Sequence, residues 1–132
     1  MIHIDHRSRV PIYEQIQTGF EALVLAGALK REDQLPSVRS LAKDLAINPN
    51  TIAKAYQLME VSGFIYSLPG RGSFIALDRA ALQARRRPEA LVRFQEAGFQ
   101  LKEVGVTKEE ASRELARIYA QTSERRAADD SD

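Results

Sequence analysis

The sequence predicts a mainly helical α+β chain, in which three helices and a β-hairpin are followed by a shorter helical segment. Residues 36–62 hold two amphipathic helical patterns separated by a tight turn, and residues 64–77 hold two β-rich runs on either side of the letters PGRG. Helices bury apolar side chains at spacings of three and four, whereas hairpin strands are joined by glycine-containing turns. The order helix, turn, helix, hairpin therefore predicts a winged helix-turn-helix over residues 1–77.

Three helices are expected before Gly63. The first begins at Pro11, a residue suited to a first helical turn, and is followed by a loop at 27–34. Ser37 is expected to cap the second helix and Asn48 the third, because their side-chain oxygens can accept hydrogen bonds from unpaired backbone N–H groups. The expected buried faces are Ile12, Ile16, Phe20, Leu23, Val24 and Gly27 in the first helix, Val38, Leu41, Ala42 and Leu45 in the second, and Ile52, Ala55, Tyr56 and Met59 in the third.

From residue 78 onward the sequence becomes helical in pattern and strongly charged. Asp78 is expected to cap a fourth helix, and Gly105 to end it. Pro88 lies inside this pattern and is expected to kink or split the helix, because proline lacks a backbone N–H. The letters TKEE at 107–110 form a capping box that opens a last helix.

These C-terminal helices carry an apolar stripe that they cannot bury by themselves. Its members are Leu91, Phe94, Leu101, Leu115, Ile118 and Tyr119. Two helices alone do not form a core, so we expect a second copy of the chain to cover part of the stripe. Residues 78–122 are therefore interpreted as an element that forms a homodimer, and residues 123–132 as a disordered tail.

Composition excludes several functions. The chain has no cysteine, which rules out disulfides, thiolate metal sites and cysteine nucleophiles. His3 and His6 are a poor metal site, and residues 1–9 around them are expected to form an arm or a short edge strand. With no membrane-length apolar stretch and no signal peptide, we expect a cytoplasmic protein. No catalytic constellation is found, so we expect neither an enzyme nor a cofactor.

The third helix presents a polar outer face when its apolar residues are turned to the core. On a wheel of about 100° per residue, this face carries Asn50 and Lys54, with Thr51 at its edge. Asparagine can pair with adenine, threonine can contact phosphate or a thymine methyl, and lysine can reach phosphate or guanine. Asn48, Asn50, Thr51 and Lys54 are therefore candidate readers of a DNA major groove. Asn48 acting only as a cap, and Lys54 as part of a solvated face, are the alternatives.

Two further sites could hold the DNA backbone. Ser37 and Arg39 lie in the first turn of the second helix, where a hydroxyl, a guanidinium and backbone N–H groups can bind phosphate. The hairpin tip Gly70-Arg71-Gly72 suits the minor groove or the phosphates beside it. As alternatives, Arg39 could pair with Asp44 or with an acid of the first helix, and the tip could be a plain turn.

The overall charge is low for a nucleic-acid-binding protein. The net charge is +1 and the pI about 8.1, whereas many DNA-binding domains are strongly basic. A weak local excess of positive charge predicts that one copy alone binds DNA weakly, because phosphate contacts carry most of the affinity. A winged helix used for protein–protein interaction is therefore kept as the alternative function, and a duplex-binding assay separates the two.

The stretch from Pro11 to Ile75 resembles the N-terminal domain of GntR-family bacterial transcription regulators. The resemblance is carried by LPSVRSLAKDL, by NPNTIAKAYQLME with a glycine three residues later, and by GRGSF. The segment VGVTKEEA resembles the YtrA-type subfamily, whose members carry only a small helical dimerisation element. The resemblance implies a dimeric repressor that binds double-stranded DNA at a pseudo-palindromic operator, often beside transporter genes.

The resemblance also assigns candidate contacts. Family DNA-contact positions correspond here to Arg39, Asn48, Asn50, Thr51, Lys54 and the wing glycines Gly70 and Gly72. Several related regulators carry arginines at the start of the recognition helix, where this chain has Pro49 and Ala53. Base reading is therefore expected from asparagine and threonine. No set of residues names a small-molecule effector.

Overall fold

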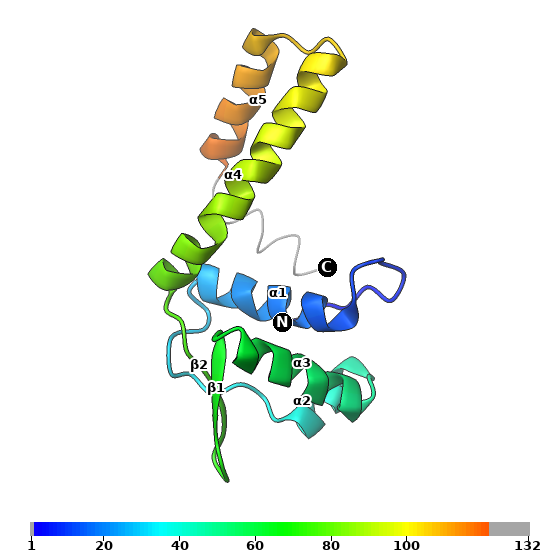
Figure 1. The fold of residues 1–132 in the computed structure, drawn as a ribbon, viewed down its shortest axis with the longest axis vertical. Helices are drawn as coiled ribbons and strands as arrows, with labels where there is room; N and C mark the ends of the chain where they lie inside the picture. Colours follow the sequence, from blue (N-terminus) through cyan, green and yellow to red (C-terminus); the bar gives the residue numbers. More distant parts are fainter. Residues whose placement is uncertain (1, 122–132) are drawn as a thin grey trace. The chain divides into compact units, whose positions relative to one another are not determined.

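The computed structural model describes residues 2–121, which form five helices and one two-stranded antiparallel sheet (Figure 1). The elements are α1 (Ile12–Leu25), α2 (Val38–Leu45), α3 (Pro49–Val61), β1 (Ile65–Leu68), β2 (Gly72–Ile75), α4 (Arg79–Glu103) and α5 (Lys108–Ala120). The chain divides into two compact units, residues 1–83 and 84–132. The mainly helical α+β class expected from the sequence is confirmed, as is the order of a winged helix-turn-helix. The tail expected to be disordered, residues 123–132, lies outside the described residues.

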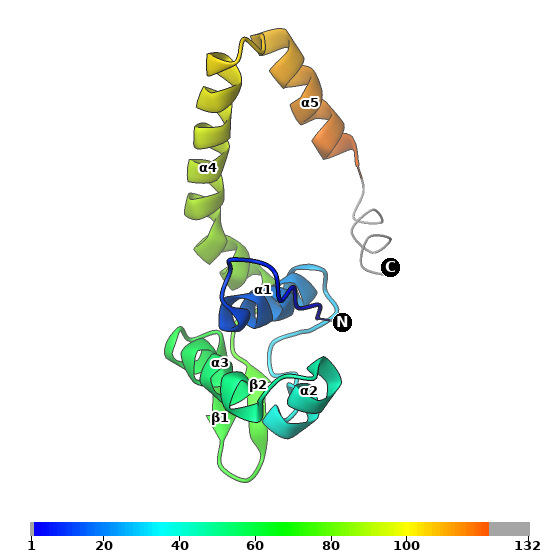
Figure 2. The same cartoon turned by 90° about the vertical axis from the view of Figure 1, so that its right-hand side faces the viewer.

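The first unit has one hydrophobic core, and α1 and α3 lie side by side across it (Figure 2). Phe20 of α1 and Tyr56 of α3 meet edge to face, with ring centroids 6.2 Å apart. Leu82, near the start of α4, is only 1% exposed and belongs to the same core. The other buried apolar residues are Ile2, Ile16, Val24, Leu35, Leu41, Ala42, Ile52, Ala55, Met59, Phe64, Ile65 and Ile75.

The hairpin is shorter than the sequence predicts. Strands were expected at 64–68 and 73–77, whereas β1 and β2 pair only from Ile65↔Ile75 to Leu68↔Gly72. The Arg71 N–H donates to the Leu68 carbonyl at 2.9 Å and closes a four-residue turn. Pro69 and Gly70 occupy its centre, and the positive φ of Gly70, 72°, is the one that a type II turn requires.

The expected loop at 27–34 ends in a short β-like segment, which we call the strap (residues 32–35). The Leu35 N–H donates to the Ser73 carbonyl at 2.8 Å, and the Ile75 N–H donates to the Asp33 carbonyl at 2.9 Å. Gln34 and Phe74 form an isolated antiparallel bridge. The strap thus lies along β2 and pairs with it through this single bridge. It has no alternating apolar pattern, so the sequence gives no strand signal there.

The N-terminal arm contains no strand within residues 2–10, so the arm is the form that the structure adopts. Ile2 is buried beside Gly19, where a Cβ would stand 2.9 Å from two Ile2 carbons. The Gln15 side chain holds the arm by accepting the Asp5 N–H at 2.7 Å and donating to the Asp5 and Val10 carbonyls. The helix was expected to begin at Pro11, whereas Pro11 is its N-cap and α1 begins one residue later, at Ile12.

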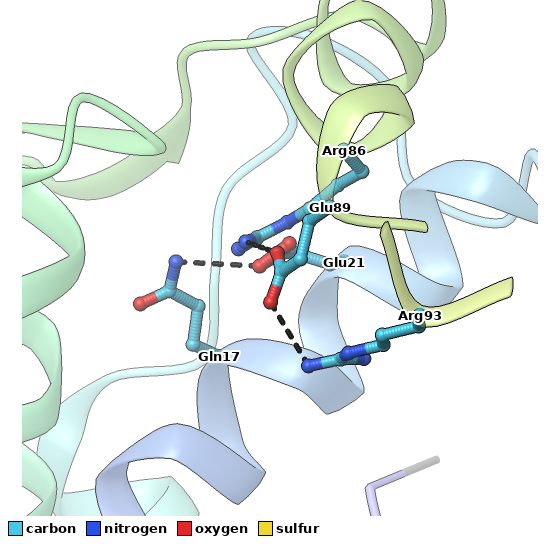
Figure 3. Close-up of polar contacts among 5 residues, drawn as sticks. All are labelled: Gln17, Glu21, Arg86, Glu89 and Arg93. Carbon is cyan, nitrogen blue, oxygen red and sulfur yellow. Dashed lines mark hydrogen bonds and ion pairs between the residues drawn. The ribbon is translucent and has the colours of Figure 1, made fainter. Parts of the chain in front are cut away.

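Side chains within α1 and side chains within α4 form polar contacts (Figure 3). In the first unit, Gln17 donates to Glu21, a buried carboxylate of α1, at 3.3 Å. In the second unit, Glu89 pairs with Arg86 at 3.3 Å and with Arg93 at 2.9 Å. The pair Arg86–Glu89 spans Pro88 on one helix face and helps to hold the turns before and after it together.

The expectation that Pro88 splits the fourth helix is wrong, because α4 is one helix from Arg79 to Glu103. A proline removes one N–H donor, but the good helix formers around it keep the remaining backbone bonds. The Ala81 N–H donates to the Asp78 carboxylate at 2.8 Å, so the predicted cap is present. Thr107 caps α5 by accepting the Glu110 N–H at 3.2 Å.

Candidate nucleic-acid interface

The helix-turn-helix is built by two capped helices and a tight turn. The Ser37 hydroxyl accepts the Ser40 N–H at 3.0 Å, and the Asn48 side chain accepts the Asn50 N–H at 2.8 Å. Pro49 occupies the first position of α3, where its missing N–H has no helical partner in any case. Ala46 ends α2 in the left-handed conformation, with φ 53° and ψ 46°. Both caps were predicted from the sequence and are confirmed.

The two faces of α3 are separated as the helical wheel predicts. Ile52, Ala55 and Met59 are fully buried and Tyr56 is nearly so, whereas Asn50 and Lys54 are exposed. Thr51 is half-buried at the edge between the faces. Within residues 2–121 the Lys54 ammonium forms no ion pair. The first two turns of α3 therefore present small polar groups and one cation that is not neutralised by a neighbour.

Tyr56 ties α3 to the start of α2. Its hydroxyl donates to the Pro36 carbonyl at 2.6 Å, immediately before the Ser37 cap. Burial raises the pKa of the Tyr56 phenol far above its ordinary value, which keeps the hydroxyl protonated and able to donate. The hydrogen bond fixes the N-terminus of α2, with Ser37 and Arg39, relative to the outer face of α3.

Arg39 lies on the exposed surface of the first turn of α2. No ion pair joins it to Asp44 or to an acid of α1 in the described part of the chain, so that alternative is not found. The Ser37 hydroxyl uses a lone pair for its cap and still has an O–H to donate. The start of α2 thus offers a guanidinium and a hydroxyl to an anion.

The wing is a hairpin with cross-strand side-chain contacts and a basic tip. The rings of Tyr66 and Phe74 stack across the strands with centroids 5.4 Å apart, and the hydroxyls of Ser67 and Ser73 lie 3.0 Å apart. Arg71 is exposed at the tip and has no ion pair within residues 2–121. Stacked and hydrogen-bonded cross-strand pairs stabilise a two-stranded hairpin that would otherwise be marginal.

A shallow hollow of about 590 Å³ brings the wing and the start of α2 together. Its wall includes Ser37 from the helix and Gly70, Arg71 and Gly72 from the wing. Glu60, on α3, adds one negative charge to the same wall. The sequence-predicted residues of the wing and of the α2 cap therefore line one surface. The other predicted residues belong to the first two turns of α3 and its cap: Asn48, Asn50, Thr51 and Lys54.

The residues expected to form the dimer contact belong to the second unit. All six are exposed, from 38% for Leu115 to 83% for Tyr119. No side chain of residues 84–121 is buried. The sequence interpretation missed three further exposed apolar residues of this unit, Val92, Phe99 and Val104. Val92 and Phe99 are seven positions apart on α4, a helical spacing that was a usable signal, whereas Val104 follows the end of the helix.

Residues 2–121 lack two features that mark other classes of protein. No helix within residues 2–121 is both long and apolar enough to cross a membrane. No group of three or more metal-ligating side chains that could hold an ion is found there either, and His3 and His6 are exposed. The features of residues 2–83 that remain are a winged helix with a polar recognition helix and a basic wing, which define a nucleic-acid-binding class of protein.

Comparison with known proteins agrees with this class. Residues 12–75 match the family described as bacterial regulatory proteins, gntR family. The repressor YtrA of Bacillus subtilis is 51% identical over 76 residues, which cover 58% of this chain and 58% of YtrA. The chain thus spans little more than half the length of that relative. The regulator YhcF of the same organism is 39% identical over 106 residues, covering 79% of this chain and 86% of YhcF.

A solved structure supports the same relationship over more of the chain. A transcriptional regulator from Oenococcus oeni has a TM-score of 0.72 and 30% identity, covering 90% of this chain and 99% of that one. The chain belongs to the GntR family of bacterial regulatory proteins. The family and the YtrA-type branch expected from the sequence are confirmed.

Proposed function

We propose that this chain is a transcription repressor that binds a pseudo-palindromic DNA operator as a homodimer. The single observation that carries the proposal is the placement of three cations without ion pairs. Arg39, Lys54 and Arg71 come from α2, α3 and the wing, and none is neutralised within residues 2–121. In a winged helix-turn-helix these three elements face the duplex, so the low net charge of +1 does not describe the binding surface.

The proposed mode of binding follows from the geometry of α3. Its first turn enters the major groove, where Asn50 pairs with adenine and Thr51 contacts a phosphate or a thymine methyl. Asn48 holds the helix start by its cap and lies close enough to add a contact. Lys54, one turn further, reaches a phosphate or a guanine. Arginines used by related regulators are absent from this turn, so base reading rests on the amide and hydroxyl groups.

The backbone of the duplex is held from two sides in this proposal. Ser37 and Arg39, at the positive end of the α2 dipole, bind one phosphate. Arg71 and the adjoining glycines at the wing tip lie in or beside the minor groove. These contacts set the register of the protein on DNA, whereas α3 supplies the sequence preference.

Dimerisation completes the proposal. We propose residues 1–77 as the DNA-binding domain and residues 78–122 as the dimerisation element, with Leu91, Phe94, Leu101, Leu115, Ile118 and Tyr119 in the contact. A single module has few phosphate contacts, and two linked modules multiply their affinities through a high effective concentration. A two-fold symmetric dimer also accounts for a pseudo-palindromic site, since each half-site meets one copy.

The test is selection of bound duplexes from a random pool, followed by titration of the selected duplex. We expect the selected duplexes to contain an inverted repeat. We also expect the protein to be cytoplasmic, and its operator to lie upstream of its own gene or of a neighbouring transporter gene. Arg39→Ala should weaken binding to selected and random duplexes alike and lower the salt slope by about 1. Arg113→Ala in α5 removes the same charge at a residue that is not among the proposed DNA contacts, and it should change neither quantity. Failure to select any duplex would favour the protein–protein interaction alternative.

A further inference from the structure

We infer that Gln34 is a positioning residue for the wing, and that it fixes the backbone of Arg71 so that the guanidinium is presented to the duplex. The inference rests on the proposed function, because it deepens the role of the wing. Gln34 was not among the residues singled out from the sequence. It lies in the strap, 37 positions before the residue that it contacts.

The contact is a hydrogen bond from a side chain to the wing backbone. The Gln34 Nε2 group donates to the Arg71 carbonyl at 2.8 Å. The Arg71 N–H donates to the Leu68 carbonyl at 2.9 Å, which closes the turn. Both backbone polar groups of Arg71 are therefore paired, one by the turn and one by Gln34. Only its side chain extends from the tip without a hydrogen bond or ion pair within the described chain.

Gly72 makes this contact sterically feasible. A Cβ at position 72 would stand 2.7 Å from Gln34 Nε2, closer than real Cβ atoms approach other heavy atoms. Its φ of +115° is also a conformation that glycine tolerates far better than other residues. The second glycine of the tip is thus matched to the amide of Gln34, which approaches the backbone where a side chain would otherwise be.

The strap holds Gln34 in place for this role. The Leu35 N–H and the Asp33 carbonyl are bonded to Ser73 and Ile75 of β2, and the next residue, Leu35, is buried. Gln34 itself is exposed, so core packing does not account for its conformation. Beyond the Leu68↔Gly72 pair, the hydrogen bonds that hold the tip within residues 2–121 are its turn bond and the Gln34 bond. Removing the second should leave a four-residue tip held by the first.

A fixed tip should bind DNA more tightly than a moving one. Ordering a mobile segment on association costs conformational entropy, and a segment that is already ordered avoids most of that cost. Gln34 would therefore raise affinity through Arg71 without touching the duplex. This role predicts that its effect disappears when the Arg71 guanidinium is absent.

The experiment is a double-mutant cycle on the full chain with Gln34→Met and Arg71→Ala. Methionine keeps the length of glutamine but cannot donate a hydrogen bond. In the selected duplex titration, Gln34→Met should lower affinity by about three- to tenfold in the otherwise unchanged protein, and by less than about twofold in the Arg71→Ala background. Gln83→Met makes the same chemical change on an exposed glutamine of α4 and should leave affinity unchanged.

Amide relaxation measured by NMR without DNA supplies the second readout. In Gln34→Met the order parameters of the Gly70, Arg71 and Gly72 amides should fall from about 0.85, typical of rigid backbone, toward about 0.6. Unchanged order parameters would overturn the inference, and so would equal losses of affinity in both backgrounds, which would place Gln34 itself on the DNA. If the unchanged protein binds no duplex, the proposed function fails, while the relaxation result still decides whether Gln34 fixes the tip.

Discussion

Asn48 and Asn50 show how two identical side chains, two positions apart, take different physical roles. The Asn48 side chain accepts the Asn50 N–H at 2.8 Å and caps α3. The Asn50 side chain has no hydrogen bond within residues 2–121 and is exposed on the first turn. Its amide therefore has its full hydrogen-bonding capacity to offer to a base edge.

This difference gives a prediction for two alanine variants. Asn50→Ala should lower specific affinity by about 1–3 kcal/mol, as for the loss of one good base contact, with little change in stability. Asn48→Ala should cost about 1 kcal/mol of unfolding free energy through the lost cap, together with any DNA contact. Thermal melting and operator titration of both variants check this. The assignment of the reading face fails if Asn50→Ala keeps the original ratio of affinities for operator and random duplex.

The elements show which features a sequence encodes locally. The caps at Ser37, Asn48, Asp78 and Thr107 depend on a side chain and an N–H two or three residues away, so short-range chemistry predicts them. The buried face of α3 depends on periodicity alone. Both kinds of prediction are confirmed.

Features that depend on contacts distant in sequence were not predictable in the same way. The strap pairs with β2, some forty positions later, and carries no strand pattern of its own. The Gln34 and Tyr56 hydrogen bonds likewise join separate segments. The split expected at Pro88 was wrong for a different reason: one missing N–H was weighed above the favourable helix propensity of its neighbours. The DNA contacts and the dimer contact stay predictions.

At the scale of α2 and α3, we expect the Tyr56 hydroxyl to stabilise the folded state modestly. Tyr56→Phe removes the hydrogen bond to the Pro36 carbonyl and keeps the ring against Phe20. We expect a loss of about 1 kcal/mol of unfolding free energy, the usual net value for one such bond. Urea denaturation of the two proteins measures it. A variant as stable as the original protein would mean that water replaces the phenol without loss.

The same group predicts a dependence of stability on pH. The pKa of Tyr56 is raised by burial in the folded state, while in the unfolded chain it should lie near its ordinary value of about 10. Below that pH the phenol is protonated in both the folded and the unfolded state, so the Tyr56 hydroxyl makes its full contribution to the unfolding free energy. As pH rises above about 10 the unfolded state loses its proton first, so the unfolding free energy should fall. Tyr56→Phe should show a shallower decline over the same range.

At the scale of the whole molecule, the two units differ in how much they bury. The first has a core that includes fully buried side chains from α1, α3 and the hairpin, whereas residues 84–121 bury none. Large exposed apolar side chains in one segment usually mark an interaction surface. Nine of them lie on α4, on α5 and just after α4: Leu91, Val92, Phe94, Phe99, Leu101, Val104, Leu115, Ile118 and Tyr119. A second copy of the chain is the partner that the proposed two-fold operator requires.

The exposed apolar side chains of the second unit therefore predict that the chain assembles as a dimer. The full chain should sediment as a dimer at about 10 μM, and residues 1–83 as a monomer that binds the selected duplex at least about 100-fold more weakly, since the avidity of linked modules is lost. The cut is placed after Gln83 rather than after Leu77, because Leu82 is buried in the core of the first unit. Phe94→Glu together with Ile118→Glu should dissociate the full chain by placing charges in the apolar contact. Gln100→Glu adds a charge at an exposed polar position of α4 and serves as the control. A full chain that sediments as a monomer, or a fragment 1–83 that stays a dimer, would remove the second unit as the dimer contact.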